Sequence, residues 1–274
     1  MFTLPKLQKL SVYGNSLMGG HLPTKILSLG LQTLDVEDSG IIGRIPENIG
    51  SLFSLEALYL GGNDLTGSIP NLKRLTKLGK INYTIYCVHL SFYTLLCTIF
   101  SYHIYHYQTA VLDFHNNELT GTIPALSDSS KLLLKKIDLS FNKLDGTIPP
   151  NLFEIPELEF LYLNNNILSG SIPTWDSISK LKDIFLNRNR LIGSIPDISS
   201  MLFLSNITKI LINDNCLTGP VPPGICTKRQ KSPNVFKTFH VDCKPLLGKD
   251  KIIMNKCEAN CCTECFRGNP DCST

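Results

Sequence analysis

The strongest constraint on this chain is a sequence unit that recurs along most of its length. In its clearest copy the unit contains Leu52, Leu55, Leu58, Leu60, Asn63, Leu65, Gly67, Ile69 and Pro70. The same spacing recurs around seven further anchor positions, namely Asn15, Ser39, Asn117, Asn142, Asn166, Asn189 and Asn215. Neighbouring anchors are 23 to 26 residues apart, except for the 54 residues between Asn63 and Asn117. A period of this length predicts a repeat protein, in which each unit buries its apolar face only against its neighbours.

Each position of the unit has a physical role. The alternation of Leu58 and Leu60 predicts a short strand with one buried face, and strands of successive units then stack about 4.8 Å apart in a parallel sheet. The amide of the anchor asparagine can donate to and accept from buried backbone groups where the chain turns inward. We expect Ser39 to supply only part of this bonding. Gly67 permits close backbone approach, and Pro70 sets φ where the chain leaves for the other side.

The end of the unit indicates a family. Six copies end in Gly-x-Ile-Pro, at residues 43–46, 67–70, 121–124, 146–149, 170–173 and 193–196. With the repeat length, this ending resembles the plant-type leucine-rich-repeat proteins, among them receptor-like protein ectodomains. The expected fold is an α/β right-handed solenoid of eight repeats, with a parallel sheet on the concave face and short strands, turns and 3-10 segments on the convex face. We expect the solenoid at residues 1–222 and a cysteine-rich C-terminal cap at residues 223–274.

A non-repeat insertion at residues 79–110 interrupts the fourth unit and is rich in Tyr, His, Ile and Cys. It is interpreted as a transmembrane or hairpin segment, a functional loop, or a retained intron. A membrane span needs about 20 apolar residues, and the apolar stretch 87–100 is shorter and contains histidine and serine. Splice-site codons fit Gly79–Lys80 and Thr109–Ala110, which favours the intron. Removing 31 residues restores the unit as Leu75, Leu78, Leu112, Phe114 and Asn117.

Cysteines outside the insertion form an even, clustered set near the C-terminus. Such a set predicts disulfides and therefore an oxidising compartment. Zinc binding by residues 257, 261, 262 and 265 is the alternative, because the last two have CxxC spacing. The segment 257–266 resembles the cysteine-rich tail of diatom leucine-rich-repeat proteins. We assign no metal site. We expect the following cysteines to form disulfides: Cys216, Cys226, Cys243, Cys257, Cys261, Cys262, Cys265 and Cys272.

The N-terminus lacks the pattern of a signal peptide, and the repeat is already running at Leu7. We interpret the chain as N-terminally truncated, and the cysteines then place it outside the cell or at the cell surface. Asn206, in Asn206-Ile207-Thr208, is a glycosylation acceptor in that compartment. A net charge of +3 with scattered Lys and Arg argues against nucleic acid as a partner. We expect no cofactor, and membrane attachment only through parts absent from this chain.

The concave face is the predicted binding surface, because strand residues four and two positions before each anchor point outward. Aromatic side chains mixed with carboxylates are typical of recognition surfaces. For any single residue, an ordinary solvated strand face is an equally good interpretation. The candidate ligand-binding residues are Tyr13, Asp35, Glu37, Tyr59, Asp113, His115, Asp138, Tyr162, Phe185 and Asn187.

Catalysis is not expected. Asp35 with Glu37, or Asp113 with His115, share a strand face and could pair as acid and base, but no nucleophile motif or phosphate loop accompanies them. The family resemblance implies a receptor-like ectodomain that binds a protein, another macromolecule or a peptide ligand on the concave face. The alternative is a soluble secreted binder, similar to plant inhibitors of cell-wall-degrading enzymes, since no membrane span or kinase follows Cys272.

Overall fold

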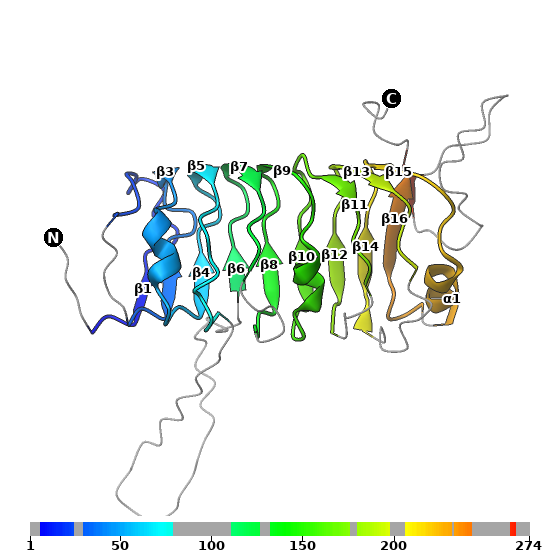
Figure 1. Cartoon of the computed structure of the whole chain (residues 1–274), viewed down its shortest axis with the longest axis horizontal. Helices are drawn as coiled ribbons and strands as arrows, with labels where there is room; N and C mark the ends of the chain where they lie inside the picture. The colour runs from blue at the N-terminus through cyan, green and yellow to red at the C-terminus, as the bar shows by residue number, and fades with distance from the viewer. Residues whose placement is uncertain are drawn as a thin grey trace, which may run out of the picture.

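The computed structural model describes residues 6–24, 30–78, 111–126, 132–175, 180–197, 206–231, 233–242 and 264–266. These residues form a solenoid whose units are stacked along the long axis of the molecule (Figure 1). One strand of each unit joins a ten-stranded parallel sheet, which confirms the predicted architecture. In order, the strands are β1 (Lys9–Ser11), β2 (Thr33–Asp35), β4 (Ala57–Tyr59), β6 (Val111–Asp113), β8 (Lys136–Asp138), β10 (Phe160–Tyr162), β12 (Asp183–Phe185), β14 (Lys209–Leu211), β16 (Thr238–Asp242) and β17 (Glu264–Phe266).

A second set of strands follows the anchors and carries the Gly-x-Ile-Pro endings. A four-stranded sheet contains β3 (Ile42–Arg44), β5 (Asp64–Ser68), β7 (Glu118–Thr122) and β9 (Lys143–Asp145), and a three-stranded sheet contains β11 (Ser169–Ser171), β13 (Arg190–Gly193) and β15 (Cys216–Leu217). We call these the lateral sheets. The remaining elements are the 3-10 helices η1 (Glu47–Ser51) and η3 (Pro150–Glu154) and the helix α1 (Pro223–Lys231). The short strands and 3-10 segments expected outside the concave sheet are therefore present.

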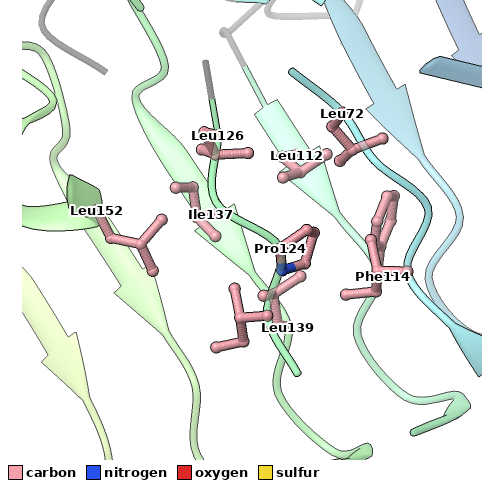
Figure 2. A pocket seen from close by; sticks show the side chains of 10 residues that line it. Leu72, Leu112, Phe114, Pro124, Leu126, Ile137, Leu139 and Leu152 are labelled. Carbon is pink, nitrogen blue, oxygen red and sulfur yellow. The ribbon is translucent and has the colours of Figure 1, made fainter. Parts of the chain in front are cut away.

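The interior between these strands is apolar. The unit leucines Leu58, Leu60 and Leu65 are fully buried, and their counterparts in the other units join one continuous core. The core contains a small cavity lined by leucine, isoleucine, phenylalanine and proline side chains (Figure 2). It has room for at most about one water molecule, and its walls offer no polar partner. This cavity is a packing defect and not a ligand site.

The anchor asparagines from Asn63 to Asn215 form a buried hydrogen-bonded ladder, as predicted. Asn63 shows the pattern: its Oδ1 accepts from the backbone N–H of Ser39 at 3.1 Å and of Ile41 at 2.9 Å. Its Nδ2 donates to the carbonyls of Val36, Leu60 and Gly61 at 2.8 to 3.0 Å. The hydroxyl of Ser39 donates to two carbonyls at 2.9 and 3.0 Å. Serine thus keeps the donor half of the bonding, including the bond to the unit before it, while the asparagines also accept from that unit.

The units on either side of the insertion stack directly on one another. β4 pairs with β6 through Leu58 opposite Leu112, and β5 pairs with β7. Leu75 and Leu78 are 0% and 1% exposed and belong to the continuous core. Residues 79–110 themselves lie outside the described residues, so the retained intron remains a proposal. The described flanks show that the repeat needs no residue of the insertion to keep its register.

The concave sheet continues beyond residue 222, where the cap was expected to begin. β16 follows β14, and its Phe239 and Val241 are fully buried, as the unit leucines are. Asp242 accepts from the N–H groups of Asp214 at 2.8 Å and Asn215 at 3.0 Å. Burial raises the pKa of Asp242, against the effect of these two bonds. The segment after α1 therefore adds a further strand to the concave sheet, and Asp242, one residue after Val241, bonds to the backbone at the anchor Asn215 and the residue before it.

The residue before each anchor adopts a left-handed backbone, with φ of 49° to 57° at the non-glycine positions. Phe141 is one of them, at φ 55°, and its side chain is 51% exposed. A left-handed backbone costs bulky residues about 1 kcal/mol or more, while asparagine tolerates it. We therefore expect Phe141→Asn to raise the free energy of unfolding by about 1 kcal/mol. Urea denaturation would measure the change, and a loss of stability would show that Phe141 packs productively.

Candidate functional site

The concave sheet presents three outward columns, six, four and two residues before each anchor. Tyr13 is 59% exposed at the N-terminal end of this face. Six other predicted residues are partly exposed: Glu37, Tyr59, His115, Tyr162, Phe185 and Asn187. The three aspartates Asp35, Asp113 and Asp138 are instead buried, with exposures of 6%, 4% and 7%. The residues predicted to face outward thus lie on this face, but the aspartates among them are largely covered by neighbouring atoms.

The aspartates are covered because they bond to the backbone of their own strand end. Their Oδ1 atoms accept from the N–H two residues later, at 3.3 Å for Asp35, 3.2 Å for Asp113 and 3.1 Å for Asp138. Side chains also contribute, since Ser140 Oγ donates to Asp138 at 2.6 Å. These carboxylates close the turn after each strand and add negative charge to the face. Their neighbours on the same face, such as Glu37 and His115, are more exposed.

Four residues near the N-terminal end of the face form what we call the acidic notch: Glu37, Gly61, Asp113 and His115. His115 Nδ1 lies 2.6 Å from Asp113 Oδ1, and Nε2 lies 4.0 Å from Glu37 Oε1. The imidazole lies over Gly61, where a Cβ atom would stand 2.3 Å from Nδ1. Because β4 has no side chain at this point, His115 can lie close enough to approach a carboxylate two strands away.

Charge in the acidic notch is unevenly balanced. Burial raises the pKa of Glu37, and the negative charge of Asp113 raises it further. Burial also acts to raise the pKa of Asp113, but the His115 hydrogen bond and the Lys136 ammonium outweigh it and hold this pKa below its ordinary value. The hydrogen bond to Asp113 raises the pKa of His115 against its desolvation. Protonated His115 is therefore favoured, and Glu37 is the carboxylate least well compensated.

Lys136 is a candidate residue of this face that the sequence prediction missed. Its Nζ lies 2.9 Å from Asp113 Oδ2, 3.0 Å from Asp138 Oδ2 and 5.6 Å from the centre of the Tyr162 ring. Burial acts to lower the pKa of Lys136, but the two carboxylates raise it overall. Lys136 belongs to the column six residues before the anchor, which was left out although strand alternation also points it outward. The same column contains Phe160 and Asp183.

Asp113, His115 and Asp138 also bring ligand atoms within 4.8 Å of one another, a spacing that a metal ion could use. The ammonium of Lys136 already stands between the two carboxylates. A metal ion would have to displace this lysine, so the cluster is better described as a compensated ion-pair network.

An aromatic ledge, formed by Phe160, Tyr162 and Phe185, lies beside the network. The rings of Tyr162 and Phe185 are stacked, with centroids 4.5 Å apart and an interplanar angle of 18°. The Phe160 ring is tilted 6.2 Å from Tyr162, and Lys182 Nζ lies 5.7 Å from its centroid. Burial raises the pKa of Tyr162 to about 12, with a further contribution from the Asp183 carboxylate. Tyr162 therefore stays a neutral phenol, and the ledge is an apolar surface between charged groups.

Asparagine amides continue the face beyond the ledge at positions 164, 187 and 213. Asn187 follows Phe185 on the same strand face, and its Oδ1 is buried without a hydrogen-bond partner. An unpaired buried acceptor costs about 1 to 3 kcal/mol. The side chain as a whole is partly exposed, so rotation of the amide can change which of its two polar atoms is accessible. The amide is thus a polar group next to the stacked rings.

The acid–base pair considered from the sequence does form, at Asp113 and His115. The free nitrogen of His115, Nε2, faces the Glu37 carboxylate. The Asp113, His115 and Glu37 side chains thus form a charge network.

His115 should make stability depend on pH. The pKa of His115 in the folded chain is raised above 6.5. Protonated His115 therefore adds to the free energy of unfolding fully below the pKa of the unfolded chain, and this stabilisation is lost as pH rises through the folded pKa. We expect His115→Gln to lower the melting temperature at pH 5, and the difference from wild type to shrink as pH rises past that window. Thermal unfolding at pH 5, 7 and 9 checks this. A difference that does not change with pH would contradict the assigned network.

The remaining predicted sites lie elsewhere. Cys216 and Cys226 are disulfide-bonded. Cys265 lies on β17 with an undescribed side chain, and Cys243, Cys257, Cys261, Cys262 and Cys272 lie outside the described residues. Asn206 is exposed at the surface. In the part of the chain that the structure describes, no helix combines the length and apolar character that a membrane crossing requires.

Comparison with known proteins agrees with this architecture. A family model described as Leucine Rich Repeat matches residues 54–74, 133–155 and 157–177. Receptor-like protein 39 of Arabidopsis thaliana is 28% identical over 177 residues, which is 63% of this chain and 19% of that protein. Receptor-like protein 35 of the same plant is 30% identical over 187 residues, 66% of this chain and 16% of that protein.

Solved structures give the same picture. The crystal structure of a TDR receptor is 28% identical with a TM-score of 0.58, and the match covers 77% of this chain and 31% of that one. The PEPR1–AtPEP1 structure has the same TM-score at 24% identity, with coverage of 77% and 25%, and supports the fold alone.

The chain is therefore a leucine-rich-repeat protein of the plant type. Over its repeats it is related to the plant receptor-like proteins, whose repeat region is a non-catalytic scaffold. It spans about a fifth of the length of the curated relatives described above.

Proposed function

We propose that this chain is the ligand-recognition part of a receptor-like protein, and that it binds a protein or peptide ligand on its concave face outside the cell. One observation carries the proposal: the charged side chains of the acidic notch, the Lys136 network and the rings of the aromatic ledge lie on neighbouring strands of the concave sheet from β2 to β12. Aromatic rings flanked by charges are typical of the contact residues that dominate recognition.

The extracellular location rests on separate support. Disulfide bonding of Cys216 and Cys226 fits an oxidising compartment. The exposed Asn206 would be the glycan acceptor there, because Thr208 supplies the required hydroxyl residue two positions later. The remaining cysteines would then form further disulfides that staple the C-terminal end.

Selection from a random-peptide phage library on the purified chain tests the binding face. We expect the selected peptides to lose about tenfold or more in affinity for the double variant Tyr162→Ala/Phe185→Ala, because aromatic anchors of this size contribute 1 to 2 kcal/mol or more each. Phe53→Ala is the matched control, since Phe53 is 44% exposed but lies outside the concave sheet. Equal binding to the double variant and wild type would overturn the proposed face.

A further inference from the structure

We infer that the concave face takes an extended peptide running across the strands, with a basic side chain at the acidic notch and an aromatic side chain or proline on the aromatic ledge, four or five residues apart. This inference rests on the proposed function and names the ligand chemistry and its register. Three observations carry it: an excess of carboxylates over cations around Glu37, an accessible stacked surface at the ledge, and the distance between them.

The notch selects for a cation. Around Glu37 the chain places the carboxylates of Asp35, Asp38 and Asp113, although the net charge of the whole chain is +3. Glu37 Oε1 lies 4.0 Å from His115 Nε2, and among the described residues no lysine or arginine forms an ion pair with Glu37. Glu37 is 33% exposed, so a ligand ammonium or guanidinium can reach it. Such a cation would supply the charge that the chain does not, and like charge would be repelled.

The ledge selects for a flat apolar group. Tyr162 and Phe185 present a stacked pair of partly exposed rings, held between Lys136 on one side and the asparagine amides on the other. Aromatic and proline side chains pack well on such surfaces and lose little conformational entropy. The buried, unpaired Oδ1 of Asn187 adds an acceptor that a backbone N–H of the bound peptide would satisfy.

The sheet sets the spacing between the two contacts. Gly61, at the centre of the notch, lies two residues after the end of β4, and the stacked rings lie on β10 and β12. With neighbouring strands about 4.8 Å apart, β10 is three strand spacings from β4 and the midpoint of the stacked pair is three and a half, which gives roughly 14 to 17 Å. An extended chain advances about 3.3 to 3.6 Å per residue, so this distance corresponds to about four or five residues. Lys136, on β8 between them, has its Nζ on the Asp113 and Asp138 carboxylates, and its third N–H could donate to a carbonyl of the connecting backbone.

Parallel phage selections test the inference on wild type, Glu37→Arg and the matched control Glu118→Arg, which alters an exposed glutamate on a lateral sheet. Wild type and the control should enrich Arg or Lys four or five residues from an aromatic residue or proline. Glu37→Arg should enrich Asp or Glu at the basic position. Circular dichroism would confirm that all three proteins are folded. Synthetic peptides from the wild-type selection should bind Glu37→Arg about tenfold more weakly and recover when their basic residue becomes Glu.

The outcomes separate this inference from the proposed function. Peptides that depend on Tyr162 and Phe185 but show no charge preference at Glu37, or no fixed spacing, overturn the inference and leave concave-face binding intact. Peptides that ignore Tyr162, Phe185 and Glu37 alike overturn both. A charge preference that switches equally in Glu118→Arg would show a general electrostatic effect and also overturn the inference.

Discussion

Asn166→Ala is expected to lower the free energy of unfolding by about 3 to 5 kcal/mol, which is a large share of the total stability of a typical domain. The Asn166 side chain accepts from the N–H of Leu144 at 3.0 Å and donates to the carbonyls of Leu139, Leu163 and Asn164 at 2.9 to 3.4 Å. All four contacts are buried. Alanine would leave these groups without a partner and without access to water, at about 1 to 3 kcal/mol for each group that stays unpaired.

Asn15→Ala provides the matched control, since Asn15 holds the anchor position of the first unit. Its Nδ2 donates to the carbonyls of Val12 and Tyr13 at 2.7 and 3.1 Å, but these contacts are exposed, so water can replace them. We expect a loss of less than about 1 kcal/mol. Chemical denaturation monitored by circular dichroism measures both variants. Similar losses would show that the ladder does not contribute through burial.

Deleting residues 79–109 is expected to leave a folded solenoid that is more stable than the full chain by up to about 3 kcal/mol, because closing a loop of this length costs entropy. The deletion joins Leu78 to Ala110 and gives the fourth unit the same spacing as Leu55 to Leu58. β4 and β6 already pair directly. The intact apolar core on both sides of the insertion supports the same expectation.

Deleting residues 79–110 is the matched control, because it removes one residue more and shifts β6 against its connection to Leu78. A shift of one residue moves strand side chains toward the opposite face, so the variant lacking residues 79–110 should have a clearly lower free energy of unfolding than the variant lacking residues 79–109. Thermal unfolding compares the two deletions. If the shorter deletion fails to fold, the insertion contributes to the native structure. Sequencing mature transcripts tests the origin of the segment: retention of these codons in every message would contradict the intron proposal.

The fold was predictable because each unit repeats the same few packing demands. Leu58, Leu60 and Asn63 have their predicted burial and bonding, and the corresponding residues of other units follow them. The sheet beyond residue 222 was harder to predict, since Phe239 and Val241 replace the usual leucines and Lys244 stands where the spacing expects the anchor asparagine. Phe239 and Val241 keep the buried role of the leucines although the side chains differ.

The side-chain arrangement of the concave face was predictable only in outline. Strand alternation placed Tyr162 and Phe185 outward, but it could not show that they stack or that Asp113 is buried. Those properties depend on neighbouring units, as does the bridging position of Lys136. The approach of His115 toward Glu37 depends on the missing side chain at Gly61. Such contacts between units are set by the stacked structure and not by the spacing within one repeat.

The most direct test of concave-face recognition is a crystal structure of the chain with its tightest selected peptide. We predict that the peptide lies across β4 to β12, with one side chain against Tyr162 and Phe185 and a basic group beside Glu37. A peptide bound to the lateral sheets or to the convex side would contradict the account.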